Sequence, residues 1–125
     1  MAVVEIPRAE WGEFLESFTK QHRDWLIDVR VTEPTPGDEA EGRQLALVGV
    51  GFADEPPGRG TILLRAGKLE GSTASHTLVD PTGVRVFRRD GGADAALQIE
   101  SRSGAQLVLQ FRSPHPVEAV DGILG

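Results

Sequence analysis

Residues 6–31 decide the fold of this chain, and they read IPRAEWGEFLESFTKQHRDWLIDVRV. Their first half places apolar and aromatic residues at the spacing of one helix face, namely Trp11, Phe14, Leu15, Phe18 and His22. After Trp25 the period changes to two, since Ile27 and Val29 alternate with polar residues. The stretch therefore predicts an amphipathic helix over about 8–22 that is followed directly by a half-buried strand.

The rest of the chain repeats short alternating stretches that end in turn residues. The clearest pair lies within residues 97–111, where two alternating stretches flank the turn at 102–104 and predict a hairpin. We expect one domain over 1–125, with a β-rich body over about 25–112. A short tail should follow, with a helical turn starting at Pro116. The predicted class is α+β, with the helix packed on a curved, mostly antiparallel sheet or small barrel of about seven short strands.

Composition excludes several classes of protein. The 125 residues include no cysteine, which excludes a disulfide framework, a thiolate metal site and a cysteine nucleophile. The net charge of −6 repels phosphate backbones. The N-terminus lacks the basic region of a signal peptide, and the longest apolar run, residues 45–53, is far shorter than the ~20 residues of a membrane helix. We therefore expect a cytoplasmic protein without membrane association.

Two groups of short motifs suggest a family. The opening carries IPxxEWxxFLxxF over residues 6–18 and HxxWL over 22–26, and the later part carries VRV at 84–86 and FRSP at 111–114. This pattern resembles a family of small uncharacterised bacterial proteins, known as a domain of unknown function, over nearly the whole chain. The resemblance implies a shared fold and no activity. It also implies a glycine at the position that Asp24 occupies here.

His76 and Asp80 are the candidates for acid–base chemistry. A histidine four residues before a carboxylate, at the end of a strand, could act as a general base that Asp80 orients toward Ser75 or Thr77. The alternative is that His76 is an ordinary strand residue and that Asp80 caps the turn at Pro81. The sequence favours the second interpretation, because no nucleophile elbow accompanies the pair.

Arg85, Arg88 and Arg89 form the densest basic cluster, with Phe87 between them. Such a cluster could stack and bind single-stranded nucleic acid. The alternation of a strand splits it between two faces, which favours ordinary cross-strand ion pairs instead. We therefore do not expect nucleic-acid binding, and Arg85 is kept as a candidate binding residue.

Metal binding is not expected. The histidines, which are His22, His76 and His115, have no paired or acidic spacing that is typical of a metal site. His22 ends the apolar helix face, where it could be a ligand, a pH switch or a partly buried residue that closes the helix. The sequence gives no sign of a cofactor.

The leading hypothesis is a non-catalytic module that binds a protein partner or a second copy of itself as a homodimer. A small sheet leaves edges that can pair, and Val108 is an apolar residue on the outward side of its strand. The rival is a small-ligand-binding β-barrel, with an interior lined by Trp25, Leu47, Leu64 and Phe111 and with His76 at the mouth. An acid–base enzyme that uses His76 and Asp80 ranks below both.

Overall fold

The computed structural model describes residues 2–33, 39–55, 57–68 and 71–116. In chain order the elements are β1 (Ala2–Glu5), the 3-10 turn η1 (Arg8–Glu10), α1 (Trp11–His22), β2 (Trp25–Thr32), β3 (Glu39–Ala53), β4 (Thr61–Gly67), β5 (Thr73–Val79), β6 (Pro81–Arg88), β7 (Asp94–Ser101) and β8 (Gln106–Pro116). The predicted helix over 8–22 therefore comprises a short 3-10 turn and the α-helix that continues it. The expected direct passage from helix to strand is confirmed.

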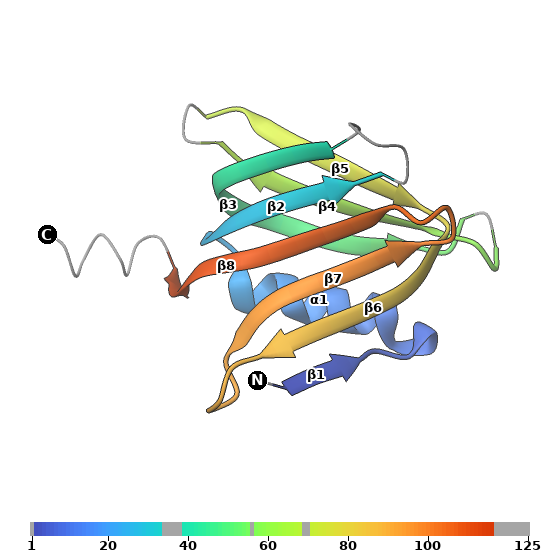
Figure 1. Cartoon of the computed structure of the whole chain (residues 1–125), viewed down its shortest axis with the longest axis horizontal. Helices are drawn as coiled ribbons and strands as arrows, with labels where there is room; N and C mark the ends of the chain where they lie inside the picture. Colours follow the sequence, from blue (N-terminus) through green and yellow to red (C-terminus); the bar gives the residue numbers. More distant parts are fainter. Residues whose placement is uncertain (1, 34–38, 56, 69–70, 117–125) are drawn as a thin grey trace, which may run out of the picture.

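All eight strands belong to one antiparallel sheet with the order β1-β6-β7-β8-β2-β3-β4-β5 (Figure 1). β3 is the longest strand, and it pairs with β2 through its first half and with β4 through its second half. The register shifts between Ile27 and Val29 in β2, and between Leu47 and Gly49 in β3. Such irregularities increase local twist and bend a strand, which helps the sheet to curl around the helix.

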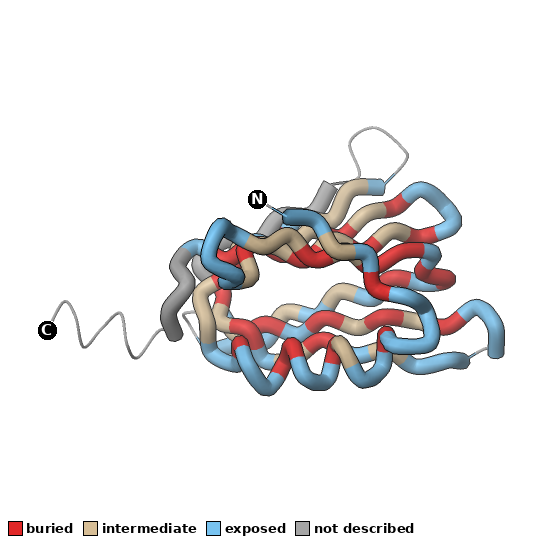
Figure 2. The backbone as a smooth tube through the Cα atoms, turned by 90° about the horizontal axis from the view of Figure 1, so that it is seen from below, coloured by how far each residue is buried: buried red, intermediate tan, exposed pale blue. Residues whose placement is uncertain are grey.

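The hydrophobic core lies between α1 and the strands (Figure 2). From the helix come Trp11, Leu15 and Phe18, each with at most 2% of its surface exposed. Phe14, on the same predicted face, is only partly buried. The strands contribute alternate residues, chiefly Ile27, Val29, Leu45, Leu47, Ile62, Leu64, Val84, Val86, Leu97, Ile99, Leu107, Leu109 and Phe111. The predicted faces of the helix and of β2 are confirmed.

Of the two alternatives that the sequence left open, the mostly antiparallel sheet is confirmed, whereas the small barrel and the count of about seven strands are wrong. The described residues form eight strands, and the sheet is open because β1 and β5 are its two ends. β1 has only four residues and shows no clear alternation, so no pattern in the sequence indicates it. Leu47, Leu64 and Phe111, which a barrel would have used to line a ligand cavity, are buried in the core with the helix. The α+β class is correct.

The end of the chain also differs from the expectation in part. The hairpin predicted within 97–111 is the β7–β8 pair, and its turn is closed by a hydrogen bond from the N–H of Ser101 to the carbonyl of Ala105 at 2.8 Å. β8 continues to Pro116, where the sequence predicted a helical turn to begin. Residues 117–125, the rest of that predicted tail, lie outside the described residues.

The link between α1 and β2 has an unusual backbone. Asp24 has a φ of 72°, and its N–H donates a hydrogen bond to the carbonyl of Leu47 at 2.8 Å. This left-handed conformation favours glycine, and aspartate is among the few other residues that adopt it readily. The glycine that the family resemblance implies at position 24 therefore has a backbone reason.

Candidate functional site

The structure does not bring together the four candidate residues of the sequence analysis, which are His76, Asp80, Arg85 and Val108. His76 is partly buried in the edge strand β5, opposite Leu64 of β4. Arg85 lies in β6, where its guanidinium is 2.9 Å from a carboxylate oxygen of Glu100 and 3.7 Å from one of Glu5. These contacts are the cross-strand ion pairs that the alternation predicted.

Val108 and Asp80 lie elsewhere in the sheet. Val108 is half-buried in β8, between Gln98 of β7 and Arg30 of β2, so it is central and not at an edge. Asp80 is the single residue between β5 and β6. Within the described part of the chain, no hydrogen bond or ion pair joins Asp80 to His76, so the geometry offers no oriented acid–base pair.

Asp80 holds three chain segments together through its backbone. Its N–H donates to the carbonyl of Gly60 in the β3–β4 connection, and its carbonyl accepts from the N–H of Arg102 in the β7–β8 turn, each at 3.0 Å. Its φ of 55° is left-handed. The side chain of Asp80 therefore lies where the β3–β4 connection, the β7–β8 turn and the link between β5 and β6 meet.

The carboxylate of Asp80 is unevenly satisfied. Oδ2 accepts a hydrogen bond from Nε of Arg102 at 3.0 Å and lies 3.6 Å from Nε of Arg59. Oδ1 is buried and has no hydrogen-bond partner among the described residues. Buried polar atoms are nearly always paired in native proteins, so this oxygen calls for an explanation.

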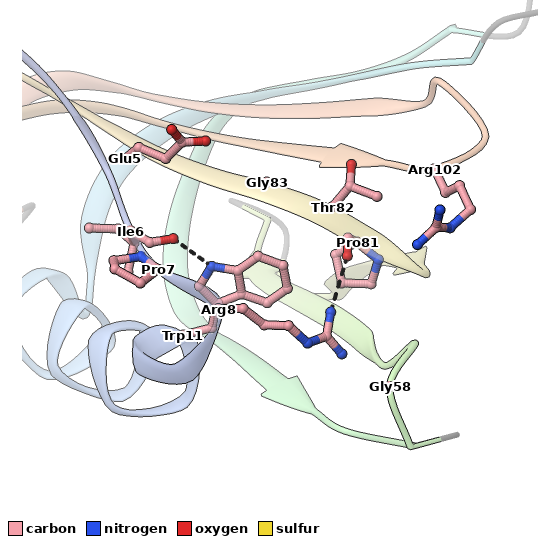
Figure 3. A pocket seen from close by; sticks show the side chains of 10 residues that line it. All are labelled: Glu5, Ile6, Pro7, Arg8, Trp11, Gly58, Pro81, Thr82, Gly83 and Arg102. Carbon is pink, nitrogen blue, oxygen red and sulfur yellow. Dashed lines mark hydrogen bonds between the residues drawn. The ribbon is translucent and has the colours of Figure 1, made fainter.

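A third guanidinium lies beside this junction. Arg8 packs over the ring of Trp11 at 5.0 Å and donates hydrogen bonds to the carbonyl of Pro81 at 3.5 Å and to Oδ1 of Asp54 at 3.1 Å (Figure 3). Its donors are thus used to tie the start of the helix to the strands. We call Arg8, Arg59, Asp80 and Arg102 the arginine end of the molecule.

Two hollows adjoin at the arginine end. The first, of about 560 Å³, is lined by Arg8, Trp11, Thr82 and Arg102 among others (Figure 3). The second, of about 450 Å³, is lined by a set that includes Glu33, Arg59, Thr77, Asp80, Arg102 and Ser103. Arg102 borders both hollows. Volumes of this size are within the range of small-molecule sites.

A buried polar group of different character lies at the other end of α1. Nδ1 of His22 is 2.8 Å from the carbonyl oxygen of Phe18, and Nε2 of His22 is 3.3 Å from Oδ2 of Asp94. The other oxygen of Asp94, Oδ1, accepts a hydrogen bond from Nε of Arg88 at 3.2 Å. Burial lowers the pKa of His22, while the hydrogen bond to Phe18 and the charge of Asp94 oppose that shift. His22 packs between the rings of Phe18, Trp25 and Phe111, at centroid distances of 4.5–4.7 Å.

The two edges of the sheet differ in their protection. β1 has four residues, ends in a charged residue and is followed closely by Pro7. β5 has seven residues, TASHTLV, with no acid, lysine, arginine or proline. Proline, charge and short length are the usual means by which proteins prevent edge strands from pairing. The outer edge of β5 lacks all three.

The sequence missed the arginine end as a cluster. Arg8, Arg59 and Arg102 are separated by more than forty residues each, and only the fold brings them around Asp80. The available signals were the glycines next to Arg59 and the turn at 102–104. Neither signal indicates that two turns meet.

Among the described residues there is no group of three or more histidine, aspartate or glutamate side chains that could hold a metal ion. The described part of the chain contains no helix whose length and hydropathy would let it span a bilayer.

The geometry defines an α+β protein in which one helix packs on an open antiparallel sheet, with a buried carboxylate between arginines at one end. A model of a family of unknown function, DUF5335, matches residues 2–120, and the chain belongs to that family. The family resemblance is therefore confirmed, and it assigns no activity. No curated protein and no solved structure matches the chain.

Proposed function

We propose that this protein is a non-catalytic, self-associating module in which two copies pair through the outer edges of β5. The observation that carries the proposal is the position of β5 at the end of the sheet order, with an outer edge that no described strand covers. Antiparallel pairing of two identical edges is compatible with a two-fold axis, and it would continue the sheet from one copy into the next. A bacterial, cytoplasmic setting remains a prediction of the sequence.

The composition of β5 supports pairing. Thr73, Ser75, Thr77 and Val79 are exposed, and they share one side of the strand. Three of these four residues are β-branched, a type that packs well on pleated surfaces. Val79 is 60% exposed, so pairing would remove apolar surface from water.

The expected strength is modest. Seven residues per copy give a small contact, and each cross-strand side-chain pair contributes only about 0.2–1 kcal/mol. Interfaces below about 1,200 Å² are typical of weak or transient complexes. We therefore expect a dimer with a dissociation constant in the micromolar range.

Analytical ultracentrifugation tests the proposal. The mass should rise from the monomer value of 13.5 kDa toward twice that value as concentration increases from about 1 to 100 micromolar. Thr77→Lys in β5 should abolish the rise, because two copies would bring like charges together at the paired edge. Val3→Lys in β1 is the matched control, since Val3 is an exposed apolar residue on the other edge, and it should leave the dimer unchanged.

Two results would remove the proposal. One is a constant mass of 13.5 kDa over the whole concentration range. The other is loss of the dimer in Val3→Lys with retention in Thr77→Lys, which would move the contact to β1. Circular dichroism of each variant confirms that the sheet is intact, so that a folding defect is not mistaken for loss of pairing.

A further inference from the structure

We propose that the hollow beside Asp80 binds a small zwitterion of the α-amino acid class, with its carboxylate on Arg59 and Arg102 and its ammonium group on Asp80. The site does not require the pairing proposed for β5, although Thr77 and Val79 of β5 also line this hollow. It is argued from the unpaired oxygen of Asp80, the free donors of the two arginines and the balance of charge around the hollow.

Asp80 supplies an acceptor that the protein itself leaves unpaired. The residue is only 7% exposed, and Oδ1 has no partner among the described residues, while Oδ2 contacts both arginines. An unsatisfied buried carboxylate oxygen costs free energy, and so does the left-handed backbone at Asp80. A ligand with an N–H donor would satisfy Oδ1.

Arg59 and Arg102 supply the complementary donors. Both are held through Nε by the same carboxylate oxygen, and no contact uses their terminal Nη groups within the described ranges. Their side chains are 66% and 71% exposed, so these donors reach solvent at the hollow. Two guanidinium groups placed together suit the two oxygens of a carboxylate.

The charges around the hollow select the kind of ligand. Arg59 and Arg102 are balanced by Asp80 and by Glu33, which also lines the hollow. A lone oxyanion would meet two acids, and a lone cation would meet two arginines. A molecule that carries an ammonium group and a carboxylate on the same carbon satisfies each pair, and the hollow of about 450 Å³ is large enough for an amino acid.

Binding requires a small rearrangement. Oδ1 is buried in the free chain, so neighbouring side chains must shift to admit the ammonium group, and we propose that one of the two mostly exposed arginines does so. The carboxylate of the ligand then replaces the contact to Oδ2 of Asp80 that the shifted arginine loses. Asp80 itself stays fixed, because its backbone N–H and carbonyl are bonded to Gly60 and to Arg102.

A matched set of probes tests the assignment by NMR titration of the intact chain. L-alanine carries both charged groups, propionate lacks the ammonium group, and ethylamine lacks the carboxylate. L-alanine should shift the amide signals of Gly60, Asp80, Arg102 and Ser103 in a saturable manner. Propionate and ethylamine should each bind at least about tenfold more weakly, because each leaves one charged pair unsatisfied.

Substitutions locate the site. Arg59→Gln and Arg102→Gln should each weaken L-alanine binding about tenfold or more, whereas Arg112→Gln, whose arginine pairs with Asp28 in another part of the sheet, should not change it. Asp80→Asn should also weaken binding, and if this variant fails to fold, the two arginine variants decide. Equal binding of propionate would overturn the amino-acid assignment, and the absence of a saturable shift with L-alanine would overturn the site. Because Thr77 and Val79 of β5 also line the hollow, the titrations are run at about 1 micromolar and at about 100 micromolar chain, which separates a failure of the site from a failure of the dimer.

Discussion

Asp94 and Asp80 are both nearly buried carboxylates that contact arginine, and they lie near opposite ends of α1. Asp94 places one oxygen against Arg88 and the other against the buried ring of His22. Asp80 places one oxygen against two arginines and leaves the other without a partner among the described residues. Both oxygens of Asp94 therefore contact side chains of the protein, whereas one oxygen of Asp80 can still accept a hydrogen bond.

The two surroundings explain this difference. Asp94 lies beside His22, which packs among aromatic rings, and both of its carboxylate oxygens contact side chains of the protein. Asp80 lies beside a hollow whose arginines are mostly exposed. We infer that buried charge serves stability at the His22 end and is available for binding at the arginine end.

The largest expected effect comes from the aromatic packing at the His22 end. Phe18 is 2% exposed and contacts His22 and Phe111, so Phe18→Ala should destabilise the protein by about 3–5 kcal/mol. Phe14→Ala, on the same helix face but only partly buried, should cost clearly less, about 1–2 kcal/mol. Urea denaturation of the two variants measures the difference. Equal midpoints would contradict the difference in burial between Phe18 and Phe14.

A smaller effect is expected from acid. Burial lowers the pKa of His22 in the folded chain, so between that pKa and about 6.5 the unfolded chain binds more protons. The contribution of His22 is therefore fully present above pH 7 and is lost as the pH falls below about 6.5, with a slope of at most about 1.4 kcal/mol per pH unit. Thermal denaturation between pH 8 and pH 5.5 measures this loss.

Asp94→Asn sharpens the comparison with Asp80. The carbonyl of Phe18 only accepts, so Nδ1 of His22 carries the hydrogen and neutral Nε2 faces Asp94 as an acceptor. An asparagine amide would donate to Nε2, so this variant should stay within about 1 kcal/mol of the parent at pH 8.

At low pH the same variant should behave differently, because it lacks the charge that favours protonated His22. Its deficit should therefore grow between pH 7 and pH 5.5. Asp80→Asn is the control, since no histidine contacts Asp80 within the described residues and its difference from the parent should not vary over that window. Parallel pH profiles for the two variants would refute the distinction between the carboxylates.

The sequence predicted what depends on neighbouring residues. The period of 3.6 over Trp11–His22 and the period of two after it are local, and both elements formed as expected. The hairpin of β7 and β8 was predictable for the same reason, since its strands flank a short turn. Local pattern was also sufficient for the ion pairs of Arg85.

What the sequence could not predict depends on distant pairing. β1 is a strand because β6 offers it an edge, and the four residues Ala2–Glu5 carry no pattern that shows this. The sequence left open whether the sheet is curved and open or closed into a small barrel, because no single strand shows the sheet order and hence which strands are the two edges. The arginine end requires Arg59 and Arg102 to meet at Asp80 and Arg8 to reach the carbonyl of Arg59, which happens only once the β3–β4 connection and the β7–β8 turn have come together.

The smallest expected effect concerns the backbone. Asp24 and Asp80 are the two non-glycine residues with positive φ in the described ranges, and they differ in what the side chain does. Asp24 is exposed and takes part in no side-chain hydrogen bond or ion pair within the described residues, so Asp24→Gly should relieve strain and stabilise the chain slightly, by up to about 1 kcal/mol. Asp24→Ala should destabilise it by a similar amount, since alanine adopts this conformation less readily.

Asp80→Gly relieves the same backbone strain but removes the carboxylate that holds Arg102 and Arg59. It should therefore be neutral or destabilising where Asp24→Gly is stabilising, and differential scanning calorimetry at neutral pH resolves the sign. If both glycine variants raised the melting temperature equally, the carboxylate of Asp80 would contribute nothing to the free chain. The left-handed backbone at Asp80 would then be retained for something other than these two ion pairs, which would leave ligand binding as the remaining reason for an aspartate at that position.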